Sequence, residues 1–184
     1  MTFYIAQAFS FLSAFAIIIG MQCKSMKAIL FWQSLGNLAV SLGYFFLGGI
    51  SGGLICLFAV GQGGVMYLYN KQGKKPHAAV LALFIAISVV CSAVTAYFSR
   101  SFAEIFSAVG ALLYTLSIAQ QRPAASRLIY LFNPLCWMCY DVFTKAIVSF
   151  IVHLVVFIST GVGIVRVDLL GKEKAATEAV ESGS

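Results

Sequence analysis

The amino-acid sequence predicts an all-α integral membrane protein. Its seven transmembrane helices are expected to form two parallel three-helix repeats joined by a linker helix, a 3+1+3 plan. Of the 184 residues, 61% are hydrophobic and 10% are charged, whereas soluble domains carry about a quarter charged residues. The apolar residues gather into seven long stretches, and similar features recur in the same order in the two halves of the chain.

Each apolar stretch is close to the length that a membrane span requires. About 20 residues of helix cross roughly 30 Å of hydrocarbon, and a helix satisfies its own backbone hydrogen bonds in lipid. No Lys or Arg precedes the first stretch, so we expect it to remain as a helix rather than to be cleaved as a signal peptide. The predicted spans are 4–20, 28–47, 51–69, 78–98, 102–119, 127–145 and 147–167.

The repeat shows as identities at a nearly constant offset. At i+97 Ala6 matches Ala103, Phe9 matches Phe106, Ser10 matches Ser107 and Ala14 matches Ala111; at i+96 Asn37 matches Asn133 and Tyr44 matches Tyr140. Two three-helix units separated by one further helix have the same orientation across a membrane, as in parallel-repeat transporters.

The basic residues predict the orientation of the helices. With seven spans, ten of the twelve Lys and Arg fall on one side, and only Arg100 and Lys145 fall on the other. The positive-inside rule then places the N-terminus outside and the C-terminus in the cytoplasm. The ten residues are Lys24, Lys27, Lys71, Lys74, Lys75, Arg122, Arg127, Arg166, Lys172 and Lys174.

The connections are too short for a soluble domain, so we expect a single membrane domain over residues 1–168. It comprises a first repeat (4–69), a linker helix (78–98) and a second repeat (102–167). Residues 169–184 turn charged and small, and are expected to form a disordered cytoplasmic tail. Any function therefore lies within the helix bundle.

Two polar stripes suggest a site inside that bundle. The second span carries Gln33, Asn37, Ser41 and Tyr44 at helical spacing, and the sixth carries Asn133, Trp137, Tyr140, Asp141 and Thr144. Such a face avoids lipid. One interpretation is that the two asparagines join helices by hydrogen bonds. The other, favoured by their equivalent positions in the repeat, is a central substrate site formed by Gln33, Asn37, Tyr44, Asn133, Trp137 and Tyr140.

Three further residues of the second half are candidates for gating or coupling. Asp141 is expected to be a gate or an ion-pair partner of Lys145 at i+4, with proton coupling as the alternative. Pro134 frees a backbone carbonyl and kinks its helix, which suits a hinge but also occurs in static helices. His153 either titrates or binds substrate, or serves as a hydrogen-bond partner in helix packing.

No metal, cofactor or enzymatic chemistry is expected. Cys136 and Cys139 form a C-x-x-C pair, but they lie in an apolar helix without a second Cys or His pair at metal-ligand spacing. Protease, hydrolase and nucleotide-binding motifs are absent from the sequence, which excludes an ATP-driven pump for this chain alone. The net charge of +6 is explained by basic residues facing anionic lipid, without nucleic acid.

Several segments resemble the YgjV-type bacterial inner-membrane proteins. These are the run from Tyr130 to Asp141, the run from Gly161 to Asp168, and the first-repeat segment from Gln33 through Asn37 to Tyr44 and Gly48. That family is similar to the SWEET, PQ-loop and PnuC vitamin-transporter group. The resemblance implies a 3+1+3 fold with substrate between the triplets, beside Asn37, Asn133 and Trp137. The Pro-Gln pair of the PQ-loop group is absent, and Tyr140 stands where PnuC-type proteins have a second Trp.

Two functional hypotheses follow. The first is a facilitator-like transporter of a small polar, uncharged solute such as a sugar or vitamin, because the candidate site is mainly neutral and aromatic. The second is a non-transporting receptor or assembly protein of the same fold. The expected partners are membrane lipid and, for the first hypothesis, the solute; the sequence leaves a homo-oligomer open. The expected location is the bacterial inner membrane.

Overall fold

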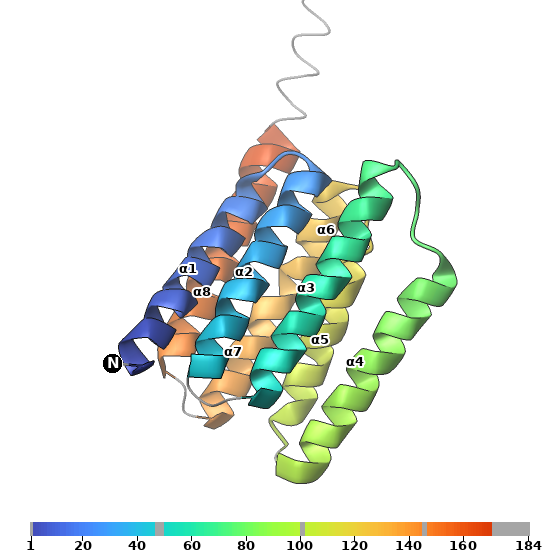
Figure 1. The fold of residues 1–184 in the computed structure, drawn as a ribbon. Helices are drawn as coiled ribbons and strands as arrows, with labels where there is room; N and C mark the ends of the chain where they lie inside the picture. The colour runs from blue at the N-terminus through green and yellow to red at the C-terminus, as the bar shows by residue number, and fades with distance from the viewer. Residues whose placement is uncertain (1, 47–49, 100–101, 145–146, 171–184) are drawn as a thin grey trace, which may run out of the picture.

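The described part of the chain consists of helices and short connections, without a β-strand (Figure 1). The computed structural model describes residues 2–46, 50–99, 102–144 and 147–170. The elements are α1 (Thr2–Gln22), α2 (Met26–Phe46), α3 (Ile50–Lys71), α4 (Ala78–Ser99), α5 (Glu104–Ile118), α6 (Pro123–Tyr130), α7 (Phe132–Thr144), α8 (Ile147–Gly163) and the π-helix η1 (Ile164–Leu169).

These elements confirm that the protein is all-helical, and helices cover the regions of the predicted spans. Within the described residues, four segments are long and apolar enough to cross a membrane: Phe3–Gln22, Met26–Phe46, Gly53–Lys71 and Ser149–Leu169. Ala78–Val94 and Glu104–Ile118 form shorter apolar helices. Helix η1 extends to Leu169, one residue into the predicted tail, and 171–184 lie outside the described residues.

The sixth predicted span is divided into α6 and α7, which are separated by Leu131. Pro134 explains where the break falls. It has no N–H to donate to the carbonyl of Tyr130, four residues earlier, and its ring crowds that carbonyl. The Leu131 N–H still donates to the Arg127 carbonyl at 2.8 Å. The interruption therefore falls one turn before the proline, while the backbone of Leu131 keeps helical dihedral angles, φ −54° and ψ −34°.

The helices of the bundle form a closed ring of contacts. Helix α1 contacts α2 and α2 contacts α3; likewise α5 contacts α7 and α7 contacts α8. The two groups meet where α1 contacts α8 and where α3 contacts α5. Helix α4 packs on α5 at the edge of the bundle (Figure 1), with Phe84 against Phe58 of α3.

A stacked phenylalanine pair occurs in both halves, within one residue of the repeat register. Phe9 of α1 stacks on Phe46 of α2 with ring centroids 5.6 Å apart and an interplanar angle of 12°. Phe106 of α5 stacks on Phe143 of α7 at 5.6 Å and 17°. Both members of the second pair follow the first by 97 residues, so the packing of α1 on α2 resembles that of α5 on α7.

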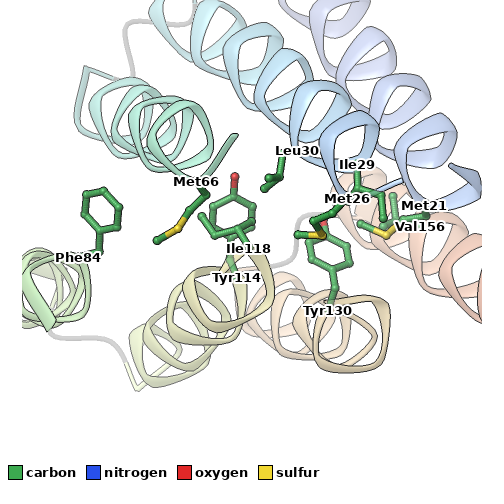
Figure 2. Packing of buried hydrophobic residues seen from close by; sticks show 10 residues of the cluster. All are labelled: Met21, Met26, Ile29, Leu30, Met66, Phe84, Tyr114, Ile118, Tyr130 and Val156. Carbon is green, nitrogen blue, oxygen red and sulfur yellow. The ribbon is translucent and has the colours of Figure 1, made fainter. Parts of the chain in front are cut away.

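The described Lys and Arg side chains lie toward one end of the bundle, here called the basic end. It contains the α1–α2, α3–α4 and α5–α6 connections and η1. The opposite end, which contains the start of α1, is called the N-terminal end (Figure 1). A buried apolar cluster joins both halves (Figure 2). Its members are Met21, Met26, Ile29, Leu30, Met66, Phe84, Tyr114, Ile118, Tyr130 and Val156.

Candidate functional site

The polar stripe of α2 divides between the interior and the bundle surface. Gln33 is 1% exposed and Ser41 is fully buried, whereas Tyr44 is 40% exposed. Ser41 Oγ donates to the Gly53 carbonyl of α3 at 2.8 Å. Asn37 is half-buried, and its Nδ2 donates to the Gln33 carbonyl at 2.9 Å and to the Tyr114 hydroxyl of α5 at 3.0 Å. The face predicted from the sequence thus reaches two neighbouring helices.

We call six polar residues of α2, α3 and α5 the central polar cluster: Gln33, Ser34, Asn37, Gln62, Tyr114 and Thr115. Gln33 is joined to the others through its backbone carbonyl, which accepts from Asn37, and a Cβ added at Gly63 would lie near both Ser34 Oγ and the Tyr114 hydroxyl. Gln62 Nε2 donates to Thr115 Oγ1 at 3.2 Å, and the Tyr114 hydroxyl donates to the Ala59 carbonyl at 3.4 Å. Sequence analysis missed Tyr114 and Thr115, because neither belongs to a recognisable polar stripe. The one feature of the sequence that points to this position is Gly110, which lies one helical turn before Tyr114.

Gln33 is the least satisfied member of the cluster. Among the described residues, neither its Nε2 nor its Oε1 has a hydrogen-bond partner, and Ser34 Oγ also lacks one. Leaving a buried amide or hydroxyl unpaired costs about 1–3 kcal/mol. Buried polar groups without a partner are few in folded proteins, and a water molecule or a ligand is a common explanation. The cluster therefore has unused hydrogen-bonding capacity inside the bundle.

Asn133 binds the same helix as Asn37. Its side chain is 6% exposed, and its Nδ2 donates to the Gly110 carbonyl of α5 at 2.6 Å. Gly110 and Tyr114 are one turn apart, so the two repeat-equivalent asparagines converge on one face of α5. No hydrogen bond joins the two asparagines to each other within the described residues.

Trp137 lies against α5 at the same level. A Cβ added at Gly110 would lie 3.0 Å from Trp137 Nε1, so the indole packs directly on the glycine. Trp137 also contacts Tyr140 edge-on, with ring centroids 5.7 Å apart. Gly110 thus allows a close approach of α7, which an added Cβ would crowd.

Asp141 and His153 form a pair in the structure. Asp141 Oδ2 and His153 Nδ1 are 2.6 Å apart, with side chains 4% and 27% exposed. The sequence analysis had treated these residues separately and had paired Asp141 with Lys145, which lies outside the described residues. Trp137 stacks on the imidazole with centroids 5.9 Å apart and an interplanar angle of 18°. Tyr44 of α2 lies close enough to Tyr140 and Asp141 to interact electrostatically with them.

Arg127, which sequence analysis counted among the basic residues facing lipid, lies inside the protein. Its side chain is fully buried. Nε donates to the Met21 carbonyl at 2.8 Å, Nη1 donates to Asp168 Oδ1 at 2.6 Å, and Nη2 donates to the Cys23 carbonyl. Burial raises the pKa of the Cys23 thiol, and the positive charge of Arg127 acts in the opposite direction. Arg127 therefore joins the end of α1 to α6 and η1.

The cysteines and the surface offer little further chemistry. All five thiols are free; Cys136 is half-buried and Cys139 exposed. The described residues contain no group of three or more side chains that could hold a metal ion. A depression of about 360 Å³ lies at the basic end, away from the central polar cluster. It is lined by α3 and by the connection that leads to α4, including Tyr69, Lys74 and His77.

Apolar helices of spanning length, a polar interior and exposed apolar side chains on the outer faces of the helices define a multi-pass helical membrane protein. A comparison with protein families agrees and is more specific. The chain belongs to the Imp-YgjV family, described as bacterial inner membrane proteins, whose model matches residues 4–170. This confirms the resemblance seen in the sequence and the inner-membrane location. No curated protein and no solved structure gives a significant match.

Proposed function

We propose that this protein transports a small, polar, uncharged solute, such as a sugar or a neutral vitamin, through a site between two three-helix halves. The proposed halves are α1–α3 and α5–α8, with α4 as the linker. The proposed orientation has the basic end in the cytoplasm, as the positive-inside rule requires.

The contacts between helices support two equivalent halves. The first helix of each half contacts the last helix of the other, in the pairs α1–α8 and α3–α5. The stacked pairs Phe9–Phe46 and Phe106–Phe143 give the halves the same internal packing. A two-fold relation about an axis along the membrane normal is the symmetry expected of parallel repeats.

The observation that carries the transport proposal is the unsatisfied amide of Gln33. A polar side chain that only joins helices has its partners in the protein, as Gln62 does with Thr115. Gln33 is as deeply buried as any of them but lacks such partners among the described residues. A solute hydroxyl or amide can supply both a donor and an acceptor to it. Asn37 lies one turn away on the same face and extends this surface toward α5.

The other proposed site residues have distinct roles. Asn133 and Trp137 line the α7 side of the same interior, where an aromatic ring can pack on a sugar or vitamin ring. Tyr44 and Tyr140 lie nearer the N-terminal end, on the path to the site. Pro134 causes the break between α6 and α7. This break provides a point at which α6 can move relative to α7.

Uptake into proteoliposomes tests the proposal. Purified protein is reconstituted and supplied with radiolabelled monosaccharides, disaccharides and neutral water-soluble vitamins, and uptake is normalised to folded protein. Gln33→Leu keeps the volume but removes the amide, and should reduce uptake about tenfold or more. Gln120→Leu is the matched control, because Gln120 lies just after α5 and its amide donates an exposed hydrogen bond to the Leu116 carbonyl at 3.0 Å.

Asn37→Ala and Asn133→Ala separate transport from the alternative function. The alternative, a non-transporting receptor or assembly protein, is favoured by the hydrogen bonds of both asparagines to protein acceptors. If these asparagines only join helices, the variants should lose about 0.6–2 kcal/mol of stability without a change in uptake per folded molecule. Folded protein that takes up no member of the panel would refute the transport proposal.

A further inference from the structure

The structure places one ionisable side chain of α8 inside the bundle. His153 is the only ionisable residue between Lys145 and Arg166. It precedes Val156, Thr160 and Gly163 by three, seven and ten residues, and all three are buried. The imidazole therefore belongs to the inner face of α8, while Ile151, Leu154 and Val155 are exposed on the outer face.

Helix α7 holds this imidazole at two points. Trp137 and Asp141 are one turn apart on α7, so both reach the same side. The indole stacks on the ring, and the carboxylate bonds to Nδ1 at 2.6 Å. Together they determine the plane of the ring and direct Nδ1 to the carboxylate. With Nδ1 facing the carboxylate, the hydrogen bond sets the tautomer of the neutral ring, and the carboxylate is in place to stabilise the imidazolium.

Other titratable groups face the pair from the neighbouring helices. Glu104 of α5 and Asp141 both interact electrostatically with Tyr140 of α7. Tyr44 of α2 lies near Tyr140 and Asp141, and Cys56 of α3 lies near Tyr44. Glu104 also accepts a hydrogen bond from Ser107 Oγ at 3.1 Å, through Oε2. Lys145, at the end of α7, is outside the described residues.

We propose that Asp141 and His153 form a proton-binding site within the membrane domain. A proton from water forms an N–H bond on the neutral imidazole, and the imidazolium is stabilised by the carboxylate; release returns the proton to water. The pair then alternates between a net charge of −1 and 0. Exposure of an unbalanced charge to hydrocarbon is costly, so proton binding favours conformations in which the pair is least hydrated. If the protein transports a solute as proposed above, solute movement depends on protonation of the pair. This consequence rests on the proposed transport function.

Trp137 is a built-in reporter of this protonation. An imidazolium in contact with an indole quenches its fluorescence more strongly than a neutral imidazole does. The chain has two tryptophans, so Trp32→Phe leaves Trp137 as the single indole. Fluorescence of this variant in nanodiscs should fall in one step as the pH is lowered, within the range where histidine titrates, about pH 5–8. The measurement needs no solute, so it can fail or succeed independently of the transport proposal.

Four further substitutions in this background assign the titration. His153→Gln should abolish the fluorescence step. Asp141→Asn should move its midpoint to lower pH by about one to three units, because the carboxylate no longer stabilises the imidazolium. His77→Gln, at the exposed second histidine, should leave the midpoint unchanged, and Glu104→Gln should move it less than Asp141→Asn does, because Glu104 makes no hydrogen bond to the imidazole among the described residues. Should Trp32→Phe not fold, the same comparison in the otherwise unaltered chain retains the step over a constant Trp32 background.

Two outcomes would overturn the proposal. The first is a fluorescence that is independent of pH over this range, as expected of a pair that is a permanent packing contact. The second is a step that persists in His153→Gln or has the same midpoint in Asp141→Asn. A loss of stability in these variants without any change in the titration would have the same meaning, because a structural role predicts only that loss.

Discussion

The buried guanidinium of Arg127 allows a stability prediction that can be worked from its contacts. Arg127→Met keeps the length of the side chain and removes its charge and its three hydrogen bonds. The substitution leaves the carbonyls of Met21 and Cys23 without these donors and leaves the Asp168 carboxylate without its cation. Removing one partner of a buried ion pair typically costs about 3–5 kcal/mol.

The geometry places the expected loss near the lower limit of that range. The Asp168 side chain is 10% exposed although its Oδ2 is buried, so a small rearrangement at the end of the bundle lets water reach the unpaired carboxylate. We therefore expect Arg127→Met to lower the free energy of unfolding by about 3 kcal/mol, or roughly a hundredfold in the folding equilibrium. Asp168→Asn should cost less, about 1–2 kcal/mol, because the two backbone acceptors still bind the guanidinium.

Equilibrium unfolding in mixed micelles of dodecyl sulfate and dodecyl maltoside, followed by circular dichroism, measures these differences. Arg166→Met is the matched control: Arg166 lies in η1 near Asp168 but is exposed, and its loss should change stability by no more than about 0.5 kcal/mol. In the double variant Arg127→Met, Asp168→Asn, the loss should be smaller than the sum of the single losses. Equal effects of Arg127→Met and Arg166→Met would refute the reasoning.

Three further predictions use the same protein. Gln33→Leu should raise the free energy of unfolding by about 1–3 kcal/mol, because it removes an unpaired buried amide; a loss of stability would mean that Gln33 has partners inside the protein. Gly110→Ala should destabilise by about 1–3 kcal/mol by pressing a methyl group on Trp137, whereas Gly64→Ala, with nothing within 4 Å of the added Cβ, should be neutral or slightly stabilising; similar unfolding curves for the two would contradict this packing. Reporter fusions after residue 168 should be active with a cytoplasmic reporter such as green fluorescent protein, and activity only with a periplasmic reporter would reverse the proposed orientation.

The helices themselves could be predicted because hydropathy and helix breaking are local properties. An apolar run of about 20 residues has few alternatives to a spanning helix, and Pro134 interrupts its helix whatever surrounds it. The stripe Gln33, Asn37, Ser41, Tyr44 follows from helical spacing alone. That stripe also indicated correctly that Gln33 and Ser41 are buried, since a polar face avoids lipid.

The partners of these side chains were decided by tertiary structure. Asn37 bonds to Tyr114, 77 residues away, and Arg127 bonds to the Met21 carbonyl, 106 residues away. Such pairs depend on the rotation and axial shift of helices packed against each other, and no local pattern encodes those quantities. Asp141 illustrates this: no local spacing along α7 pointed to His153, which the orientation of α8 brings to the carboxylate. Sequence alone could therefore define the membrane class and the polar faces, while the packing of α7 on α8 and of α1 on α6 determined which polar groups pair.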